Sequence, residues 1–242
     1  MAKGHRGRLF AGTSGFAYRD WSPRFYPAGM PLSRALSEYA GRLSACELNN
    51  TFYRHPTAAA IARWVSQTPD GFRFTVKAQR GGSMGALLSD PTETVPWLTA
   101  PYRLFGERLG SVLFRVPEHV ERDDERLRAL LTAWPQDLPL TLEFQHGSWA
   151  DNEVHRLLRA CGVVLCTTDL DGADPPPDLR VTGPFLYLRL RRSAYSAADL
   201  DAWAARVMPF LDAGMDTLAF FRHDADGTSA RRAMEFAGRV QS

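Results

Sequence analysis

Gly110-Ser111-Val112-Leu113-Phe114-Arg115-Val116 forms an almost continuous apolar run that has the length of a buried β-strand. A helical pattern follows near 123–134, and a second strand-like run, Leu140-Thr141-Leu142-Glu143-Phe144, comes after it. This order of strand, helix and strand is typical of a βαβ unit, in which the crossover helix makes the two strands parallel. The stretch 110–144 therefore predicts a parallel sheet covered by helices.

The same alternation recurs along the whole chain. Strand-like runs occupy eight positions: 9–14, 45–50, 72–77, 110–116, 140–144, 163–168, 185–190 and 217–221. Helical patterns fall near 31–43, 57–66, 123–134, 151–160, 197–211 and 230–240. Eight strands in 242 residues leave about 30 residues for each strand–helix unit, which is the usual βα spacing.

Eight βα units close naturally into a (β/α)8 barrel, so we predict an α/β fold of the TIM-barrel type. An open doubly wound sheet is the alternative. It requires a glycine-rich phosphate turn, and Gly12-Thr13-Ser14-Gly15 is too short for that fingerprint. Because no linker or change of composition divides the chain, we expect one barrel domain over 1–242, with a short basic tail at 1–8.

The composition is that of an ordinary globular protein. Apolar residues make up 45% and charged residues 23%, and 29 Lys and Arg oppose 27 Asp and Glu, a formal net charge of +2. No apolar run approaches the ~18 residues of a membrane span, so we expect no membrane partner. Three cysteines without a Cys-x-x-Cys motif, and a basic tail without an apolar signal segment behind it, favour reduced thiols and a cytoplasmic location.

Two connections are longer than packing requires. The segment Gln79–Thr94 contains three glycines, and the segment Asp169–Pro184 contains Pro175-Pro176-Pro177. Long connections in compact domains are often lids or binding loops, and plain surface excursions are the alternative.

In a barrel of this type the functional residues lie at the carboxyl ends of the strands, and strand alternation decides which side chains point inward. That alternation places seven polar side chains in the mouth of the barrel: Glu47, Asn49, Lys77, Arg115, Glu143, Arg189 and Arg191. Asp169 is expected at the tip of the sixth strand, and Arg222 and His223 end the eighth.

Charged residues inside a barrel must be paired or lie near solvent. One interpretation is therefore a structural ion network that seals the barrel, formed by Glu47, Lys77, Glu143 and Arg189. The other is a ligand site, because ionisable side chains from different strands converge on the face that carries function. The cations are Lys77, Arg115, Arg189, Arg191 and Arg222, against the carboxylates Glu47, Glu143 and Asp169, an excess of two positive charges. A concave cationic surface attracts an anion such as a phosphate, a carboxylate or a nucleic-acid backbone, and arginine suits phosphate by bidentate hydrogen bonding.

Other catalytic patterns are weak. The histidines form no His-Glu-x-x-His and no Cys/His ligand spacing, so we expect no metal and no cofactor. A metal could still bind if ligands from separate strand ends meet: Glu47, Glu143, His146, Asp169 and His223. Glu47 and Glu143 could form a glycosidase-type pair, but the surrounding cations would lower the pKa of both carboxyls, which disfavours a general acid.

Aromatic residues cluster outside the strands. Most are expected to fill space over the mouth or between helices, whereas Tyr18, Trp21 or Trp149 could stack on a sugar or base.

Several motifs together resemble the YecE-like family, also called domain of unknown function 72. They are Gly12-Thr13-Ser14-Gly15-Phe16 with Tyr18, Trp21 and Phe25-Tyr26-Pro27; Glu47-Leu48-Asn49-Asn50-Thr51-Phe52-Tyr53; Phe72–Ala78; Leu109-Gly110 with Leu113 and Pro117; and Glu143-Phe144 with His146, Ser148 and Trp149. The resemblance covers essentially the whole chain. It implies a (β/α)8-type barrel and no established reaction.

The chain also departs from the pattern of that family, mostly toward arginine. Arg115 stands where the family usually has Gln, Arg191-Arg192 where it has His-Gly, and Arg222-His223 where it has Asn-Asn. Further differences are Gln145 for Arg, Ser83-Met84 for Thr-His and Arg232 for Asn. Matches persist at Glu47, Asn49, Thr51, Tyr53, Lys77, Glu143, Trp149, Asp169 and Arg189.

The leading hypothesis is a barrel that binds an anionic, phosphate-bearing ligand, and whether it is an enzyme stays open. Glu47, Glu143 and Asp169 would orient the cations or act on protons. The ligand-binding candidates are Asn49, Tyr53, Lys77, Arg115, Trp149, Arg189, Arg191, Arg222 and His223. The alternatives are a nucleic-acid-binding or nucleolytic barrel, in which the arginines hold a backbone, and a non-catalytic scaffold.

Overall fold

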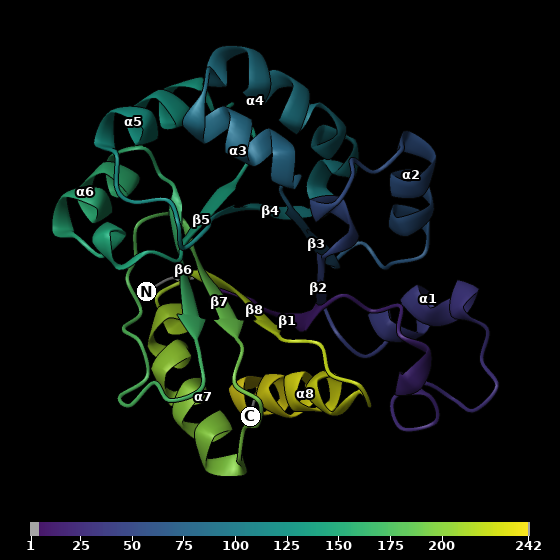
Figure 1. Cartoon of the computed structure of the whole chain (residues 1–242). Helices are drawn as coiled ribbons and strands as arrows, with labels where there is room; N and C mark the ends of the chain where they lie inside the picture. Colours follow the sequence, from purple (N-terminus) through teal and green to yellow (C-terminus); the bar gives the residue numbers. More distant parts are fainter. Residues whose placement is uncertain (1–4, 242) are drawn as a thin grey trace.

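The chain folds into a closed barrel of eight parallel strands surrounded by helices (Figure 1). This computed structural model describes residues 5–241, so residues 1–4 of the predicted basic tail lie outside the description. Each strand pairs with its neighbours in chain order, and β1 pairs with β8 to close the barrel. The predicted α/β fold of the (β/α)8 type is confirmed.

The bounds of the elements follow the predicted alternation closely. The strands are β1 (Leu9–Ser14), β2 (Ala45–Leu48), β3 (Arg73–Lys77), β4 (Leu109–Val116), β5 (Leu140–Phe144), β6 (Val164–Asp169), β7 (Phe185–Leu190) and β8 (Asp216–Phe221). The α-helices are α1 (Ala35–Ala40), α2 (Ala58–Ser66), α3 (Arg80–Leu88), α4 (Pro91–Thr99), α5 (Asp124–Ala133), α6 (Asn152–Ala160), α7 (Ala197–Asp212) and α8 (Thr228–Gln241).

The unit β4–α5–β5 shows how local sequence produces the repeating element. The side chain of Asp123 accepts hydrogen bonds from the backbone N–H groups of Glu125 and Arg126, which caps the first turn of α5. Leu127, Leu130 and Leu131 then recur at helical spacing and are buried against the strands. The helix ends at Ala133, just before Pro135, and the chain returns to pair β5 with β4.

The interior of the barrel has an apolar layer and a polar layer. Eight buried residues form the apolar layer: Phe10, Ala45, Leu113, Val164, Cys166, Tyr187, Leu218 and Phe220. Two positions further along the same strands, alternation brings polar residues inward, including Glu47 after Ala45 and Arg189 after Tyr187. The polar layer therefore lies at the carboxyl ends of the strands.

The segment Gln79–Thr94, expected to be a long loop, instead forms α3 and the first turn of α4. Gly82 packs so closely that an added Cβ atom would lie 2.7 Å from the Trp97 ring and 2.8 Å from Leu98. A Cβ atom added at Gly85 would likewise lie 3.2 Å from Cγ2 of Thr94. The loop prediction was wrong because these glycines permit close helix–helix packing, which local propensity does not reveal.

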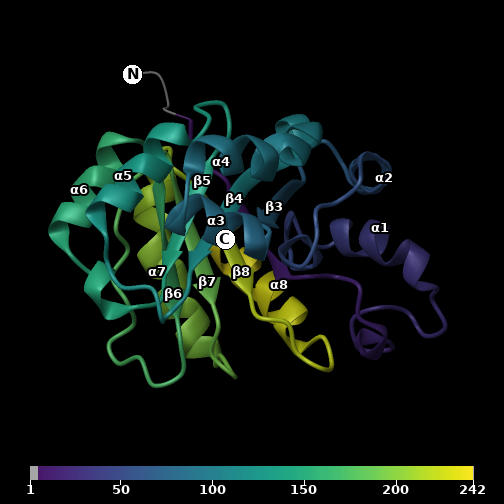
Figure 2. The same cartoon turned by 45° about the horizontal axis from the view of Figure 1, so that its top comes forward.

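The second long connection is a loop. Between β6 and β7 the chain runs without a helix through residues 170–184, and Figure 2 shows this green segment extending beyond the strands. One crossover therefore lacks a helix, while the connection between β3 and β4 carries both α3 and α4.

Two further features concern the surroundings of the protein. None of the helices in the described part of the chain combines the length and apolar character needed to cross a membrane. Cys46, Cys161 and Cys166 are free thiols, and only Cys161 is exposed.

The contact between β1 and β2 provides a test of the closed barrel. A Cβ atom at Gly12 would lie 1.8 Å from the carbonyl oxygen of Ala45, which belongs to the backbone of the paired strand. We expect Gly12→Ala to lower the free energy of unfolding in urea by about 3 kcal/mol or more. Gly147→Ala, where nothing lies within 4 Å, is the control. Equal stability of the two variants would contradict the register of β1 and β2.

Candidate functional site

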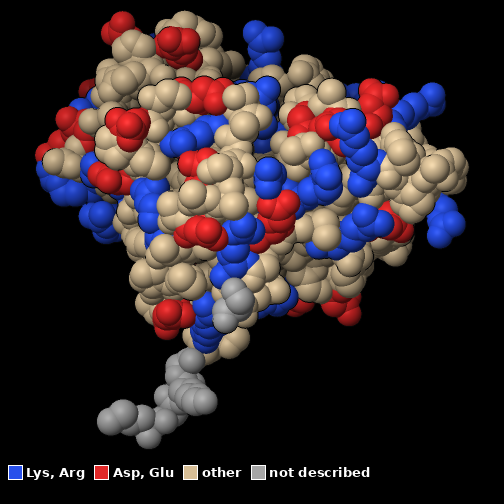
Figure 3. All heavy atoms as spheres, turned by 90° about the horizontal axis from the view of Figure 1, so that it is seen from below, with Lys and Arg blue, Asp and Glu red and all other residues tan. Residues whose placement is uncertain are grey.

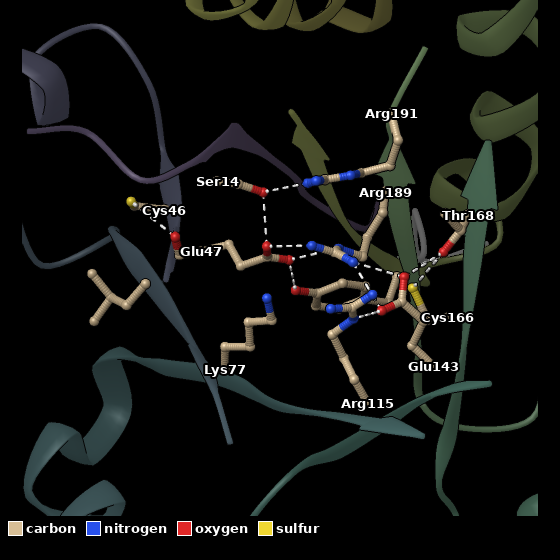
Figure 4. Close-up of polar contacts among 12 residues, drawn as sticks. Ser14, Cys46, Glu47, Lys77, Arg115, Glu143, Cys166, Thr168, Arg189 and Arg191 are labelled. Atoms are coloured by element: carbon tan, nitrogen blue, oxygen red, sulfur yellow. Dashed lines mark hydrogen bonds and ion pairs between the residues drawn. The ribbon is translucent and has the colours of Figure 1, made fainter. Parts of the chain in front are cut away.

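The polar layer collects side chains from most of the strands at their carboxyl ends. Because the strands are parallel, these ends meet on one face of the barrel. Figure 4 shows the side chains that converge there: Ser14, Glu47, Lys77, Arg115, Glu143, Thr168, Arg189 and Arg191.

Arg189 lies at the centre of this group and binds two carboxylates at once. Its Nε and Nη2 donate to the two oxygens of Glu47 at 3.0 and 2.9 Å. Its Nη1 donates to both oxygens of Glu143 at 2.7 and 2.8 Å. The side chains of all three residues are at most 5% exposed. The predicted ion network of Glu47, Glu143 and Arg189 therefore exists.

Neighbouring donors complete the hydrogen bonding of the two carboxylates. Ser14 Oγ and the Tyr187 hydroxyl donate to Glu47 at 2.7 and 2.9 Å. Thr168 Oγ1 donates to Glu143 at 2.8 Å, and Arg115 Nε donates to its other oxygen. Every oxygen of both carboxylates thus accepts two hydrogen bonds, which fills the acceptor capacity of a carboxylate.

Both glutamates are held in the ionised form. Burial by itself would raise the pKa of Glu143, but the charges of Arg189 and Arg115 outweigh burial and lower it to about 2. Burial and Arg189 oppose each other in the same way at Glu47, whose pKa is also lowered. At neutral pH neither residue carries a proton to donate, so this pair lacks the general acid of a glycosidase.

Lys77, the fourth member of the predicted network, does not join it. No residue within 5–241 forms a hydrogen bond or an ion pair with its ammonium group, and no dashed line reaches it in Figure 4. Its Nζ lies 4.2 Å from the centre of the Phe52 ring. Burial, and next the charge of Arg115, lower the pKa of Lys77 to about 8.

Arg191 and Arg222 extend the group of cations toward β8. Arg191 Nη1 donates to Ser14 Oγ at 3.1 Å, and Arg222 Nη1 donates to the carbonyl oxygen of Arg191 at 3.4 Å. Burial, and next the charge of Arg189, lower the pKa of Arg191. His223 is stacked on Tyr18 with ring centres 5.2 Å apart, and its pKa is lowered first by burial and then by Arg191. We call Lys77, Arg115, Arg191 and Arg222 the cationic rim.

The positive charge is concentrated at this face. Arg189 and the cationic rim carry five positive charges against the two of Glu47 and Glu143, a local excess of three, whereas the whole chain carries +2. On the face in Figure 3, basic and acidic side chains are interspersed. Ion pairs elsewhere in the chain include Arg239–Asp201 and Arg6–Asp212.

Comparison with known proteins identifies the family. Residues 10–242 match the family model described as protein of unknown function DUF72. The chain belongs to the DUF72 family. The family resemblance predicted from its sequence motifs is confirmed.

Related proteins support this assignment. A DUF72 family protein from Thermotoga maritima superposes with a TM-score of 0.84 at 26% identity, covering 97% of this chain and 99% of its own. One from Enterococcus faecalis shares the fold with a TM-score of 0.76 at 18% identity, covering 97% and 96%. The UPF0759 protein YunF of Bacillus subtilis is 29% identical over 150 residues, which is 58% of this chain. That match spans about half the length of YunF, 52%.

Asp169 lies outside the mouth of this DUF72 barrel, contrary to the sequence prediction. It is fully buried and accepts hydrogen bonds from the Tyr195 hydroxyl at 2.8 Å and from Trp203 Nε1 on α7 at 3.1 Å. Arg192 Nε donates to its other oxygen at 2.9 Å. Strand alternation explains the error, because Thr168 points inward toward Glu143 and the next residue must point outward.

Trp149, predicted to bind a ligand, is also placed elsewhere. Its indole is 1% exposed, donates to the Val120 carbonyl at 2.8 Å and stacks on Phe144 with ring centres 4.5 Å apart. No face of the ring is free for a sugar or a base. The packing interpretation of this aromatic residue is the one that the structure supports.

Asn49 and Tyr53 lie beside the cationic rim and not within it. Both line a groove of about 670 Å³ outside β2, and the Tyr53 side chain is 76% exposed. Tyr18 also lines this groove, while its ring stacks on His223. The groove therefore adjoins the cationic rim through Tyr18 and His223.

Sequence reasoning missed Ser14 and Thr168 as members of the site. Ser14 lies four residues after Phe10 on β1, and Thr168 lies two residues after Cys166 on β6. Phe10 and Cys166 both belong to the inward apolar layer. Strict strand alternation identifies Thr168 as the inward residue, whereas the sequence prediction chose the carboxylate of the next residue, Asp169.

Within residues 5–241, no three His, Cys, Asp or Glu side chains are grouped closely enough to hold a metal ion.

The low pKa of Glu143 makes the stability of the DUF72 barrel depend on pH in the acidic range. Because folding lowers this pKa from 4.5 to about 2, the ionised carboxylate stabilises the protein above about pH 4.5. That contribution is lost as the pH falls toward 2. We expect the urea midpoint to fall over this window, and to fall less in Glu143→Gln. The exposed Glu125→Gln variant is the control, and a wild-type profile in Glu143→Gln would contradict the pKa shift.

Removing Arg189 should be far more damaging than removing a surface arginine. Arg189→Met leaves Glu47 and Glu143 buried without their shared counter-ion, and we expect a loss of about 3–5 kcal/mol in the free energy of unfolding at pH 7. Arg103→Met breaks the exposed pair with Asp137 and should cost about 1 kcal/mol or less. Similar losses in both variants would refute a buried ion network.

Proposed function

We propose that the mouth of this barrel binds an anionic, phosphate-bearing ligand. The observation that supports this is the cationic rim, whose donors come from β3, β4 and the ends of β7 and β8 and are mostly unused. Arg115 hydrogen-bonds through Nε alone, and Lys77 has no hydrogen-bond acceptor within the described residues. Arg191 and Arg222 each use a single side-chain N–H donor.

The two glutamates cannot neutralise these cations. Arg189 alone donates four of the eight hydrogen bonds that the carboxylates of Glu47 and Glu143 accept, and it bridges both. A phosphate group supplies the missing negative charge together with several acceptor oxygens. The guanidinium groups of arginine match such oxygens in pairs.

Glu47 and Glu143 have a positioning role in this proposal. Each carboxylate is saturated with hydrogen bonds and ionised, so it holds Arg189 and Arg115 in place and does not transfer a proton. Asp169 lies outside the site and anchors Arg192 and α7.

The groove beside the rim suits the organic part of the ligand. Phe16, Tyr18, Leu48 and Trp64 give it apolar walls, and Asn49 adds a polar group near its rim end. A ligand with a phosphate at the cations and an apolar or aromatic body could occupy both regions. Tyr53, the exposed aromatic at the groove, would contact that body.

A reducing, cytoplasmic location fits the same proposal. All three cysteines are free, and two of them are buried in the barrel wall and core. Free thiols are typical of proteins in reducing compartments.

Removing two members of the cationic rim should abolish anion binding. Lys77→Met combined with Arg191→Met deletes two charged donors, each worth about 1.5–3 kcal/mol to an anion. We therefore expect the affinity for inorganic pyrophosphate, measured by isothermal titration calorimetry, to fall by about 100-fold or more. A native circular dichroism spectrum would show that the variant is folded.

The matched control removes the same charge elsewhere. Arg128→Met with Arg156→Met deletes two exposed helical arginines, and its affinity for pyrophosphate should stay within about threefold of wild type, because distant exposed charges are screened. Unchanged binding by the Lys77/Arg191 variant would refute the proposed function. Binding to single-stranded oligonucleotides that falls steeply with salt and is not displaced by pyrophosphate would favour the nucleic-acid alternative.

A further inference from the structure

Lysine is almost absent from this chain, and one of its two lysines lies in the cationic rim. The sequence contains two lysines, Lys3 and Lys77, against 27 arginines among its 29 basic residues. Lys3 lies outside the described residues, so Lys77 is the one lysine in the described part of the chain. A site that needed positive charge alone could use arginine here, as the chain does almost everywhere else.

The surroundings of Lys77 distinguish its amine from a simple charge. It lies at the carboxyl end of β3, partly buried, against the face of Phe52 and without an ion-pair partner among the described residues. Figure 4 shows its ammonium group pointing into the barrel near Glu47 and Arg115. Its side chain is not fully buried, and the guanidinium groups of Arg115 and Arg189 lie near it.

We propose that Lys77 is an amine nucleophile that forms an imine with a phosphate-bearing aldehyde or ketone, its phosphate held by Arg115, Arg191 and Arg222. This inference rests on the proposed anion site for the phosphate, and it adds the reactive group of the ligand and a covalent step. Arginine cannot replace lysine in this role, because its guanidinium keeps its proton at any accessible pH.

The step balances without an oxidant or a reductant. The ammonium group of Lys77 first releases a proton to solvent. The neutral amine adds its lone pair to the carbonyl carbon, and the oxygen takes a proton from the attacking nitrogen to give a carbinolamine. The hydroxyl group takes a proton back from solvent and leaves as water, while the nitrogen lone pair forms the C=N bond of a protonated imine. In total, an ammonium group and a carbonyl compound give an iminium ion and one water molecule.

Burial and the neighbouring arginines favour the neutral amine that the step requires. Four charged groups surround Lys77. They are Glu47 on β2, Arg115 on β4, Glu143 on β5 and Arg189 on β7. Burial and the two arginines lower the pKa of Lys77 to about 8, whereas the two carboxylates act in the opposite direction and are already bound to arginine. Lysines that act as nucleophiles are commonly activated by burial or by a neighbouring cation.

Pyridoxal 5′-phosphate with sodium borohydride tests the proposal, because the reagent is an aldehyde that carries a phosphate. Reduction converts an imine into a stable secondary amine, which peptide mass mapping locates. We expect one label at Lys77 in the wild type and in Lys3→Arg. Below saturation, labelling should increase with pH around a midpoint near 8. The absence of a label at Lys77 would overturn the proposal.

Two substitutions separate a nucleophile from a point charge. Lys77→Arg keeps the charge and Lys77→Met removes it, so Lys77→Arg should weaken pyrophosphate binding less than Lys77→Met does. Both variants should lose the label completely. A role in charge alone predicts that Lys77 of the wild type is labelled no faster than Lys3.

The phosphate requirement distinguishes failure of the imine from failure of the anion site. Pyridoxal, which lacks the phosphate, should label Lys77 at least about tenfold more slowly, and pyrophosphate should protect against labelling by the phosphate form. Equal labelling by both reagents without protection would overturn the proposal through its anion site. Pyrophosphate binding without any label would leave the anion site intact and refute the imine.

Discussion

A guanidinium group buried between two carboxylates determines how the interior of this barrel is organised. Arg189 donates to both oxygens of Glu47 and of Glu143, with all three side chains almost completely withdrawn from solvent. A charge in this position is tolerated because it is paired on both sides, and removing one partner leaves an uncompensated ion. Ser14, Arg115 and Thr168 extend the network, so that β1, β2, β4, β5, β6 and β7 all contribute to it. The register of six strands is thus tied to one set of hydrogen bonds.

The same network divides the mouth into a saturated half and an unsaturated half. The carboxylates have no acceptor capacity left, whereas Lys77 and most donors of Arg115, Arg191 and Arg222 have no acceptor within the described residues. As a result, the mouth of the barrel carries an excess of positive charge although the whole chain is nearly neutral. It also separates the residues: the buried ions hold the geometry, and the cationic rim keeps the unused donors on which the proposed anion site rests. The groove that adjoins it gives the same site an apolar extension.

Much of this arrangement could be predicted from the sequence, and the failures have identifiable causes. The alternation of strands and helices predicted the eight-stranded barrel, and period-two spacing placed Glu47, Glu143 and Arg189 inward correctly. The prediction for Asp169 was wrong because a carboxylate at the end of a strand suggests a functional residue. Strand alternation makes Thr168 the inward residue and Asp169 the outward one. The segment 79–94 is predicted to be a loop because it is a long connection that contains three glycines, whereas Gly82 and Gly85 provide close contact between α3 and α4. Trp149 is a stacking candidate by sequence, but its ring is buried against Phe144.

The sequence alone determined the order of the elements, the family motifs and the inward or outward direction of most strand residues. These are local properties, since the period of the backbone carries them along each strand. Which ions pair with one another was decided only in three dimensions. Glu47 and Arg189 are 142 positions apart in the chain, and their contact exists because the barrel closes. The same closure places Glu47 and Glu143 against Arg189 and leaves Lys77 without an ion-pair partner among residues 5–241. Charge pairing depends on distances across the barrel and not on spacing along the chain.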